Sequence, residues 1–398
     1  MHNHESIFCI IPPHMLRKIA ENGTIEQHEK AMQTIVATEQ LRGRRHGIAS
    51  VNAFSMVMTA NLIGKKRTIY DAKSGTTLPG IVVRGEGDPP VADQSVNEAY
   101  DGSGITYDLF SEIYGRNSID NKGMGLDSTV HYQKSYDNAF WDGRQMVYGD
   151  GDEDLPESQR LFNRFTSAID VIAHELTHGV TQDEANLAYW DQSGALNESF
   201  SDVFGSLVKQ YNLKQTSDQA NWIIGEGLLS SNIQGVGLRS MKSPGTAYDD
   251  PILGKDPQPA HMKDYVSTTQ DNGGVHLNSG IPNHAFYVIA VDIGGYAWEK
   301  AGMIWYKTLT EKLTERANFQ DAANMTYQTA GQLYGSGSLE QSAVKNGWLK
   351  VGINVEVLPV PTPPTPTPLP SPKIGDGCLT QIIRPLGLTG ILLKKVKK

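Results

Sequence analysis

The feature that most constrains this chain is the motif His-Glu-Leu-Thr-His at residues 174–178, followed one helix length later by an acidic segment at residues 197–202. In an α-helix, side chains four positions apart lie on one face, so both histidines can direct a nitrogen at one metal ion. Residues 167–173 are apolar at helical spacing and contain no Pro or Gly, which predicts a helix here. A longer zinc motif, HExxHxxGxxH, is excluded because Thr181 and Glu184 stand where its glycine and third histidine would fall.

Glu198 in the acidic segment is our candidate for a third ligand beside His174 and His178. Two imidazoles and one carboxylate leave a neutral zinc site with an open fourth position, which is typical of catalytic rather than structural zinc. Glu175 would lie beside the metal as a base, without being a ligand. The alternative is an ordinary helix with two surface histidines and a solvated glutamate, and the nearby acidic segment argues against it.

Several further blocks accompany the motif, in one order along the chain. They lie at residues 138–143, 171–181, 194–202, 237–241 and 271–276. With them the chain resembles the thermolysin family of neutral zinc endopeptidases over residues 68–350, and more narrowly the protealysin-like members with a short N-terminal propeptide. The ligand set of two histidines and one glutamate is taken from this resemblance. The resemblance implies an α+β fold of two lobes, β-rich at the N-terminal side and α-helical at the C-terminal side, with the zinc helix at the cleft.

The resemblance also assigns the residues around the metal. His276 and Tyr189 would donate hydrogen bonds to the oxyanion of the tetrahedral intermediate, and Asp271 would orient His276. Asp202 and Asn197 would hydrogen-bond the outer sides of the liganding histidines. Taken alone, Tyr189 would be a packing residue, and the Asp-Asn-Gly-Gly run that begins at Asp271 would be a turn.

Substrate binding is assigned in the same way. Asn138, Ala139 and Trp141 belong to an edge strand that binds an extended peptide through its backbone, and Arg239 would hold a substrate carbonyl. The pocket for the side chain after the scissile bond would be formed by Phe162, Phe165, Val171 and Leu238. We therefore expect broad specificity, with cleavage before Leu, Phe, Ile or Val. Without the resemblance, the arginine would be a salt-bridge residue and the four apolar residues would be core.

Composition limits the partners. The 398 residues are 39% hydrophobic with a net charge of −9, so we expect a globular protein without a nucleic-acid partner. The two cysteines, Cys9 and Cys378, exclude a disulfide framework. We find neither a signal peptide nor a membrane span, and expect a monomer that is cytoplasmic or exported by a non-classical route. Its partners would be peptide and protein substrates and its own propeptide, as an intramolecular inhibitor.

The N-terminal residues 1–50 are interpreted as the propeptide, with processing somewhere in residues 43–67. Pro12-Pro13-His14-Met15-Leu16 resembles the Pro-Pro-x-x-Leu motif of protealysin-like propeptides. It predicts a stiffened turn into an amphipathic helix that could lie across the cleft, or else an ordinary surface helix. Cys9 could offer a thiolate to the zinc, although a small buried apolar side chain is the simpler interpretation.

The remaining organisation follows from composition and helical spacing. The expected segments are a β-rich lobe at 68–165, a helical lobe at 166–352, a Pro/Thr-rich linker at 353–372 and a basic tail of unknown role at 373–398. Helices are expected at 168–181, 194–211, 280–293, 297–313 and 319–333. The tail could anchor the protein to an anionic surface or simply solubilise it.

The chain departs from the family pattern at the residues that would bind calcium. The positions that match its paired calcium site are Asp170, Lys209, Asn221, Ile223 and Glu226. Only two of these are acidic and one is a cation, so we expect the paired site to be degraded. The acidic run at residues 150–154 could bind one Ca²⁺, but we favour a solvated acidic loop.

Two functions fit these residues. The first is a zinc endopeptidase made as a self-inhibited precursor. The second is a non-catalytic binding protein that keeps the peptidase fold. Glu175 and His276 favour the enzyme, because a binding protein needs neither a base nor an oxyanion donor.

Overall fold

The structure, a computed structural model, describes residues 8–48 and 64–356. The chain divides into two units, Met1–Val357 and Leu358–Lys398. The basic tail and nearly all of the Pro/Thr-rich linker lie outside the described residues, as does most of the expected processing segment. Within the described ranges, no helix combines the length and the apolar character needed to cross a bilayer.

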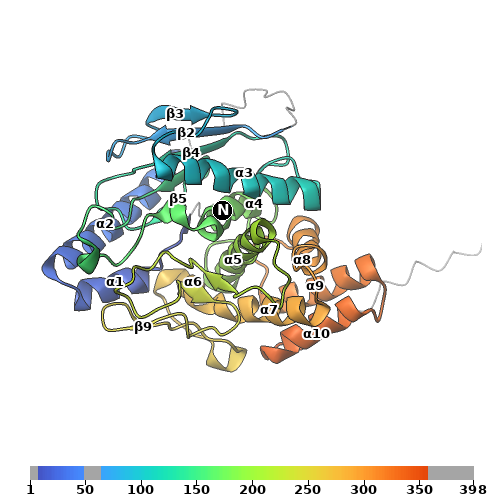
Figure 1. The fold of residues 1–398 in the computed structure, drawn as a ribbon. Coiled ribbons are helices and arrows are strands. Elements are labelled where there is room, and N and C mark those ends of the chain that lie inside the picture. Colours follow the sequence, from blue (N-terminus) through green and yellow to red (C-terminus); the bar gives the residue numbers. More distant parts are fainter. Residues whose placement is uncertain (1–7, 49–63, 357–398) are drawn as a thin grey trace, which may run out of the picture. The chain divides into compact units, whose positions relative to one another are not determined.

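A six-stranded mixed sheet forms one side of the first unit (Figure 1). Its strands are β1 (Phe8–Cys9), β2 (Arg67–Asp71), β3 (Ile81–Gly85), β4 (Leu126–Val130), β5 (Ala139–Trp141) and β6 (Met146–Tyr148). The spatial order is β1-β5-β6-β4-β2-β3. The pairs β2–β4 and β4–β6 are parallel, and the other three are antiparallel. The edge strand β1 therefore comes from the N-terminal segment, far in sequence from its neighbour β5.

A long helix, α3 (Gln94–Tyr114), lies between this sheet and the rest of the unit. Asp93 caps it by accepting a hydrogen bond from Ser95 N at 2.9 Å, and it ends at Gly115 in the left-handed conformation. Our expectation of a simply β-rich segment missed this helix. Its glycines lower helix propensity, but a Cβ at Gly102 would lie 2.4 Å from Ile172 Cδ1, so close packing requires glycine there.

The motif helix α4 (Ile169–Asp183) and the following helix α5 (Asp191–Leu213) form the centre of the unit. Both are largely buried, as expected for helices that are covered on several sides. At Gly205 a Cβ would lie 2.6 Å from the carbonyl oxygen of Asp170. The absence of a side chain there lets the two helices approach closely enough to bring their polar residues together.

The rest of the C-terminal half is helical. It contains α6 (Asp271–Asn278), α7 (Gly280–Ile293), α8 (Lys300–Glu311), α9 (Phe319–Tyr334) and α10 (Leu339–Lys350). Two small ribbons pair β7 (Ile223–Ile224) with β8 (Arg239–Ser240), and β9 (Asp249–Asp250) with β10 (Gly254–Lys255). Short 3-10 turns occur at Glu157–Gln159, Phe165–Ser167 and Met262–Asp264. The five expected helices are confirmed to within a few residues, whereas α6 and α10 were not predicted.

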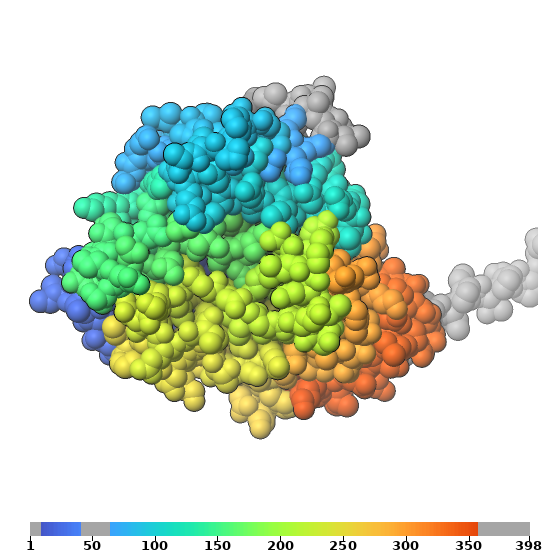
Figure 2. Space-filling model, in the orientation of Figure 1, coloured from blue at the N-terminus to red at the C-terminus, as the bar shows by residue number. Residues whose placement is uncertain are grey.

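The N-terminal helices α1 (Pro13–Asn22) and α2 (Ile25–Ile48) lie against this body. Figure 2 shows their dark blue surface at one side, next to green and yellow segments from the middle of the chain. A proline occupies the first turn of α1, where no backbone donor is needed, and the helix buries Met15, Leu16 and Ile19. The amphipathic helix predicted after the Pro-Pro pair is confirmed.

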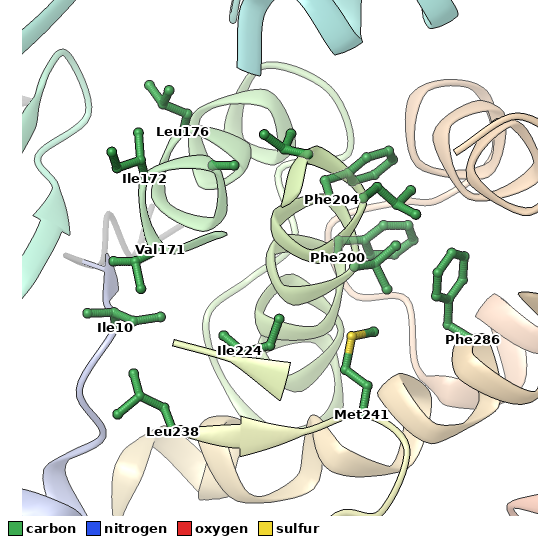
Figure 3. Packing of buried hydrophobic residues seen from close by; sticks show 14 of the residues in the cluster. Ile10, Val171, Ile172, Leu176, Phe200, Phe204, Ile224, Leu238, Met241 and Phe286 are labelled. Carbon is green, nitrogen blue, oxygen red and sulfur yellow. The ribbon is translucent and has the colours of Figure 1, made fainter. Parts of the chain in front are cut away.

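One large hydrophobic cluster joins the sheet, α3, α4 and α5 to the C-terminal helices. Figure 3 shows how Phe200 and Phe204 of α5 face Phe286 of α7, while Val171 and Ile172 of α4 face away from them. Ile10 from the N-terminal segment belongs to the same cluster and is fully buried. The N-terminal segment is therefore packed as part of the core.

Candidate active site

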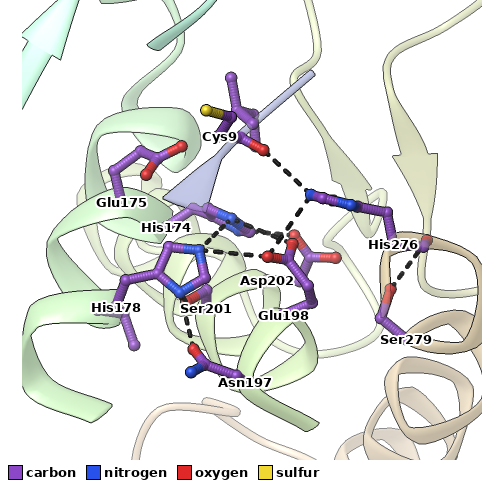
Figure 4. A network of polar contacts seen from close by, with 12 residues as sticks. Cys9, His174, Glu175, His178, Asn197, Glu198, Ser201, Asp202, His276 and Ser279 are labelled. Carbon is purple, nitrogen blue, oxygen red and sulfur yellow. Dashed lines mark hydrogen bonds and ion pairs between the residues drawn. The ribbon is translucent and has the colours of Figure 1, made fainter. Parts of the chain in front are cut away.

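The two motif histidines meet a glutamate from the neighbouring helix (Figure 4). His174 Nε2 and His178 Nε2 lie 3.0 Å apart. Glu198 on α5 places Oε2 3.6 Å from His174 Nε2 and Oε1 3.5 Å from His178 Nε2. All three side chains are completely buried. The spacing along α4 and the close packing of α5 thus create one compact cluster of metal-ligating atoms.

Hydrogen bonds to the outer ring nitrogens fix the tautomers of both histidines. His174 Nδ1 lies 2.8 Å from Asp202 Oδ1, and His178 Nδ1 lies 2.8 Å from Asn197 Oδ1. The Asn197 amide nitrogen donates to the Leu187 carbonyl at 3.1 Å, so its oxygen is the atom that faces the histidine. Both Nδ1 atoms therefore carry the proton. Burial and the neighbouring His174 hold the pKa of His178 well below its usual value, so His178 stays neutral.

With both outer nitrogens protonated, the Nε2 atoms of His174 and His178 each carry a lone pair and lie only 3.0 Å apart. Glu198 Oε2 is also buried and has no hydrogen-bond partner among the described residues. Two lone pairs and a carboxylate oxygen in a dry site repel unless a cation lies between them. The ligand atoms of the three residues all lie within 4.8 Å of one another. This donor set fits a single Zn²⁺ ion.

Glu175 lies beside this cluster and is fully buried. Its Oε2 accepts a hydrogen bond from the backbone nitrogen of Trp141 in β5 at 3.0 Å. Its Oε1 has no hydrogen-bond partner among the described residues. Burial, and then the charge of Glu198, raise the pKa of Glu175 well above its usual value. One carboxyl oxygen is thus fixed by the sheet and the other is available to a water molecule.

His276 and Tyr189 complete the polar groups around Glu198. Tyr189 donates its hydroxyl to Glu198 Oε1 and lies 3.2 Å from His276 Nε2. His276 Nδ1 lies 2.6 Å from Asp271 Oδ1. Burial alone would lower the pKa of His276, but the charges of Asp271 and Glu198 outweigh it and raise the pKa to about 9. His276 therefore carries a proton on each nitrogen at neutral pH.

A second set of contacts holds Asp202 in place. Arg239 donates to both of its oxygens, from Nε at 2.9 Å and from Nη2 at 2.8 Å. Asn283 of α7 donates to Oδ2 at 2.8 Å. Burial would raise the pKa of Asp202, but the Arg239 guanidinium and the hydrogen bond with His174 hold it well below its usual value. The sequence analysis missed Asn283, whose only signal is a polar residue in an apolar helix.

Ser201 was also missed. Its Oγ lies 3.0 Å from His178 Nδ1, which Asn197 already contacts. Ser201 follows Glu198 by three residues, so it lies on the same face of α5 and spacing could have indicated it.

The predicted peptide-binding strand holds the protein's own N-terminal segment. In β1, Phe8 and Cys9 pair antiparallel with Trp141 and Phe140. Ile10 N then donates to the carbonyl of Ala139 at 3.2 Å. The side-chain oxygen of Asn138 accepts from the backbone nitrogen of Ile11 at 3.0 Å. Residues 8–11 thus bind as an added strand, the mode expected for an extended peptide.

Two backbone carbonyls of this segment face the polar groups of the site. The carbonyl oxygen of Cys9 lies 3.1 Å from His276 Nε2, and that of Ile10 accepts from Arg239 Nη1 at 3.1 Å. Figure 4 shows the carbonyl of Cys9, not its sulfur, directed at His276. The Cys9 side chain packs with Tyr132 and Phe140 in a separate buried cluster. The suggestion of a Cys9 thiolate ligand is therefore wrong, because β1 pairing turns the sulfur toward this cluster.

The four predicted pocket residues are all buried, and two of them flank Ile10. Figure 3 shows the Ile10 side chain between Val171 of α4 and Leu238, and all three are at most 1% exposed. Phe162 and Phe165 are fully buried, with ring centroids 6.0 Å apart. The pocket and core interpretations are therefore compatible, because Ile10 fills the space.

The position of the expected paired calcium site contains a lysine of the chain itself. Lys209 Nζ lies 3.1 Å from Asp170 Oδ2, 3.3 Å from Glu226 Oε2 and 2.6 Å from the carbonyl oxygen of Ile223. The degraded paired site stays a prediction, and this ammonium gives it a physical basis.

The interpretation of residues 150–154 as a solvated loop is wrong at Asp152. This residue is only 1% exposed, and Lys30 of α2 forms ion pairs with Asp152 and Asp154.

Comparison with known proteins agrees with this geometry. Residues 39–182 match the model of the thermolysin metallopeptidase catalytic domain, and residues 185–353 match that of its α-helical domain. An extracellular metalloprotease of Pectobacterium carotovorum subsp. carotovorum is 51% identical over 88% of this chain and 97% of its own length. Protease PrtS of a Photorhabdus strain is 47% identical over 87% of this chain and 92% of its length.

A solved structure is similar as well. The precursor of protealysin, a metalloproteinase from Serratia proteamaculans, is 53% identical, with a TM-score of 0.77 over 87% of this chain and 99% of that one. Half or more of the chain thus matches in sequence and in fold, with the metal-ligating cluster in place. The chain belongs to the thermolysin family of metallopeptidases.

Proposed function

We propose that this protein is a zinc-dependent endopeptidase that hydrolyses internal peptide bonds before an apolar residue. We further propose that its N-terminal segment occupies the substrate groove in the precursor. The observation that carries the proposal is the path of residues 8–11, which run along β5 and past the metal-ligating cluster as an extended peptide would. A binding protein without catalysis is not favoured, because Glu175 keeps an unpartnered oxygen beside the cluster.

His174, His178 and Glu198 would hold the zinc ion. When bound there, zinc supplies Lewis acidity, which lowers the pKa of a coordinated water and polarises the substrate carbonyl. Glu175 accepts the proton of the attacking water on Oε1 and passes it to the leaving amine, while Trp141 N holds Oε2.

His276 and Tyr189 donate hydrogen bonds to the oxyanion that forms at the substrate carbonyl. The 3.1 Å contact between His276 Nε2 and the Cys9 carbonyl supports this, because it uses the same donor on a backbone carbonyl. Asp271 keeps the proton on His276 Nδ1. Asp202 and Asn197 keep the liganding histidines in the tautomer that presents Nε2 to the metal.

We expect a substrate to make the contacts that residues 8–11 make in this structure. Asn138 and Ala139 bind the peptide backbone, Trp141 continues this strand, and Arg239 holds a substrate carbonyl as it holds that of Ile10. The side chain after the scissile bond would enter the space that Ile10 fills between Val171 and Leu238. Phe162 and Phe165 belong to the same buried apolar cluster as Ile10, Val171 and Leu238. An isoleucine in this position supports the preference for apolar residues.

The proposed arrangement along the chain is a propeptide at residues 1–50, cut within 43–67, then lobes at 68–165 and 166–352. A linker at 353–372 and a tail at 373–398 would follow. We propose that the enzyme is a monomer and that it acts outside the cell. The Pectobacterium relative, which is named an extracellular metalloprotease, supports the location. Its partners would be peptides, proteins and its own N-terminal segment.

The deciding experiment is hydrolysis of casein and of short quenched fluorescent peptides by purified protein. We expect hydrolysis that a zinc chelator stops, that added zinc restores and that Glu175→Ala abolishes. A peptide series varied only after the scissile bond should favour Leu, Phe, Ile and Val. Hydrolysis that survives Glu175→Ala, or a preference for charged residues, would contradict the proposal.

A further inference from the structure

The second N-terminal helix docks through a polar stripe. Lys30, Thr34 and Thr38 follow one another at single-turn spacing on α2, and they are only 6%, 0% and 7% exposed. Thr34 Oγ1 accepts from the backbone nitrogen of Asp137 at 3.2 Å, and Thr38 Oγ1 lies 3.2 Å from the Tyr136 hydroxyl. The apolar side chains that α2 buries beside this stripe, Ala31 and Ala37, are small, so the helix can leave without exposing a large apolar surface. The surface it covers should then be polar and able to bind something else.

Lys30 occupies a site built from carboxylates of the body. Its Nζ lies 3.1 Å from Asp152 Oδ1 and 3.0 Å from Asp154 Oδ1. The other oxygen of Asp152 accepts from the backbone nitrogens of Leu161 and Phe162, at 2.8 and 3.1 Å. Asp152 is therefore held through Oδ2 by backbone contacts that do not depend on α2, and its Oδ1 binds the lysine.

Asp137 is a third carboxylate at this site. It is 4% exposed, and its Oδ1 has no hydrogen-bond partner among the described residues. Its backbone nitrogen donates to Thr34, one helical turn from Lys30 on α2, and its carboxyl group interacts electrostatically with Lys30 and Asp152. Burial, and then the nearby Asp152, raise its pKa well above the usual value, while the charge of Lys30 opposes this. A buried carboxyl oxygen without a partner is costly unless it serves a ligand.

We propose that Asp137, Asp152 and Asp154 form a site for a divalent cation, suited to Ca²⁺, which Lys30 fills as a tethered cation while α2 is docked. Cation binding in the processed enzyme rests on the proposed function, in which the N-terminal segment with α2 is removed. When α2 leaves, the positive charge of Lys30 and the helix that covers the carboxylates are removed at the same time. Water then reaches three carboxylates that repel one another, and a cation relieves the repulsion.

The ligand chemistry selects calcium over other cations. All three side chains offer hard carboxylate oxygens from loops, and Asp154 is 44% exposed at its side chain, which leaves room for water ligands. Ca²⁺ accepts irregular shells of oxygen and water, whereas Mg²⁺ demands near-octahedral geometry. None of the three aspartates belongs to the zinc-ligating group of His174, His178 and Glu198, so the two metals can be tested independently.

The test uses the full chain in a Glu175→Gln background, which slows self-processing. Lys30→Ala vacates the site, Lys30→Ala with Asp152→Asn destroys it, and Lys18→Ala is the matched control, since the Lys18 side chain is 51% exposed. The melting temperature of zinc-loaded protein is measured with about 10 mM CaCl2, MgCl2 or NaCl at matched ionic strength. We expect CaCl2 to raise the Tm of Lys30→Ala by about 2–5 °C, with no rise in the parent, the control or the double variant.

An equal rise in the double variant, or no rise in Lys30→Ala, would overturn the proposal. If Lys30→Ala does not fold, calorimetric titration of CaCl2 into the chain with its native Glu175, freshly purified as precursor and again after it has processed itself, decides instead. Binding that appears only after processing supports the site, and its absence overturns it. A protein without peptidase activity could still show the calcium response of Lys30→Ala, so failure of this inference and failure of the proposed function are distinguishable.

Discussion

The buried isoleucine of the N-terminal segment gives the sharpest test of self-inhibition. We predict that Ile10→Ala releases the segment from the groove. The side chain is fully buried between Val171 and Leu238. Truncation of a buried isoleucine to alanine costs about 2–5 kcal/mol, and we take roughly 2–3 kcal/mol because one wall of the groove can relax. Only the docked state bears this cost, because an undocked segment exposes residue 10 in either variant.

The ratio of docked to undocked precursor should therefore fall by about 30- to 150-fold. The assay is the initial rate of hydrolysis of a quenched fluorescent peptide by freshly purified precursor, together with the half-time of self-processing. We expect Ile10→Ala to raise the initial rate and to shorten the half-time, provided that the undocked fraction of the parent is small. The side-chain contribution is tested separately from the backbone contacts of β1, which the substitution leaves intact.

Ile25→Ala is the matched control, since Ile25 lies on α2 and is 82% exposed. It should leave the initial rate and the processing half-time unchanged. After processing, the enzymes from both variants should have the same kcat/KM as the parent, because neither residue would be present in them. An Ile10→Ala precursor as latent as the parent, or an equal activation by Ile25→Ala, would refute the reasoning.

Three further predictions concern contacts outside the groove. Asp202→Asn weakens the hydrogen bond to His174, so zinc affinity should fall by about 10- to 100-fold in a competition assay with a chromogenic chelator. Lys209→Met leaves the buried Asp170 carboxylate without its cation, so the free energy of unfolding in urea should fall by about 3 kcal/mol. The hydrogen bond with Asp150, opposed by burial, raises the pKa of His131 to about 9. Because this folded-state value exceeds the ordinary value of 6.5, the contribution of His131 to stability is complete below about pH 6.5 and is lost as the pH rises through about 9. Solvent screening of its half-exposed partners reduces that contribution to about 1 kcal/mol, and His131→Gln should remove this part of the alkaline decline in Tm.

Each of these has an outcome that would contradict it. Unchanged zinc affinity in Asp202→Asn would mean that the charge of Asp202 does not affect how strongly His174 binds zinc. A Lys209→Met protein as stable as the parent would show that the lysine is not needed to balance the buried carboxylate. A His131→Gln protein with the same decline in Tm between about pH 7 and pH 10 would exclude the imidazolium as its cause.

The sequence located the zinc helix because the relevant relation is local. Four-residue spacing places His174 and His178 on one face whatever the rest of the chain does, and apolar periodicity gave the helices around them. The third ligand and the groove residues came from the resemblance to a family. The roles assigned to these residues stay predictions, although the structure brings them together around one cluster.

Other features could not be obtained from local patterns. Helix α3 contains glycines that weaken its propensity, and tertiary packing explains them: Gly102 lies against Ile172, and Gly104 lies against Arg67. Asn283 acquires a role because α7 brings it to Asp202, 81 residues away in sequence. Cys9 was given two interpretations because its side of the strand depends on the pairing register with β5.

Only the tertiary structure showed where the N-terminal segment binds the rest of the protein. Residues 138 and 11 meet across 127 positions, and Lys30 meets Asp152 across 122. Backbone pairing and ion pairs over such distances depend on how whole elements pack, and no periodicity records them. The sequence thus determined which metal chemistry this chain can support, whereas packing determined that its own first residues fill the groove and that a lysine fills a carboxylate site.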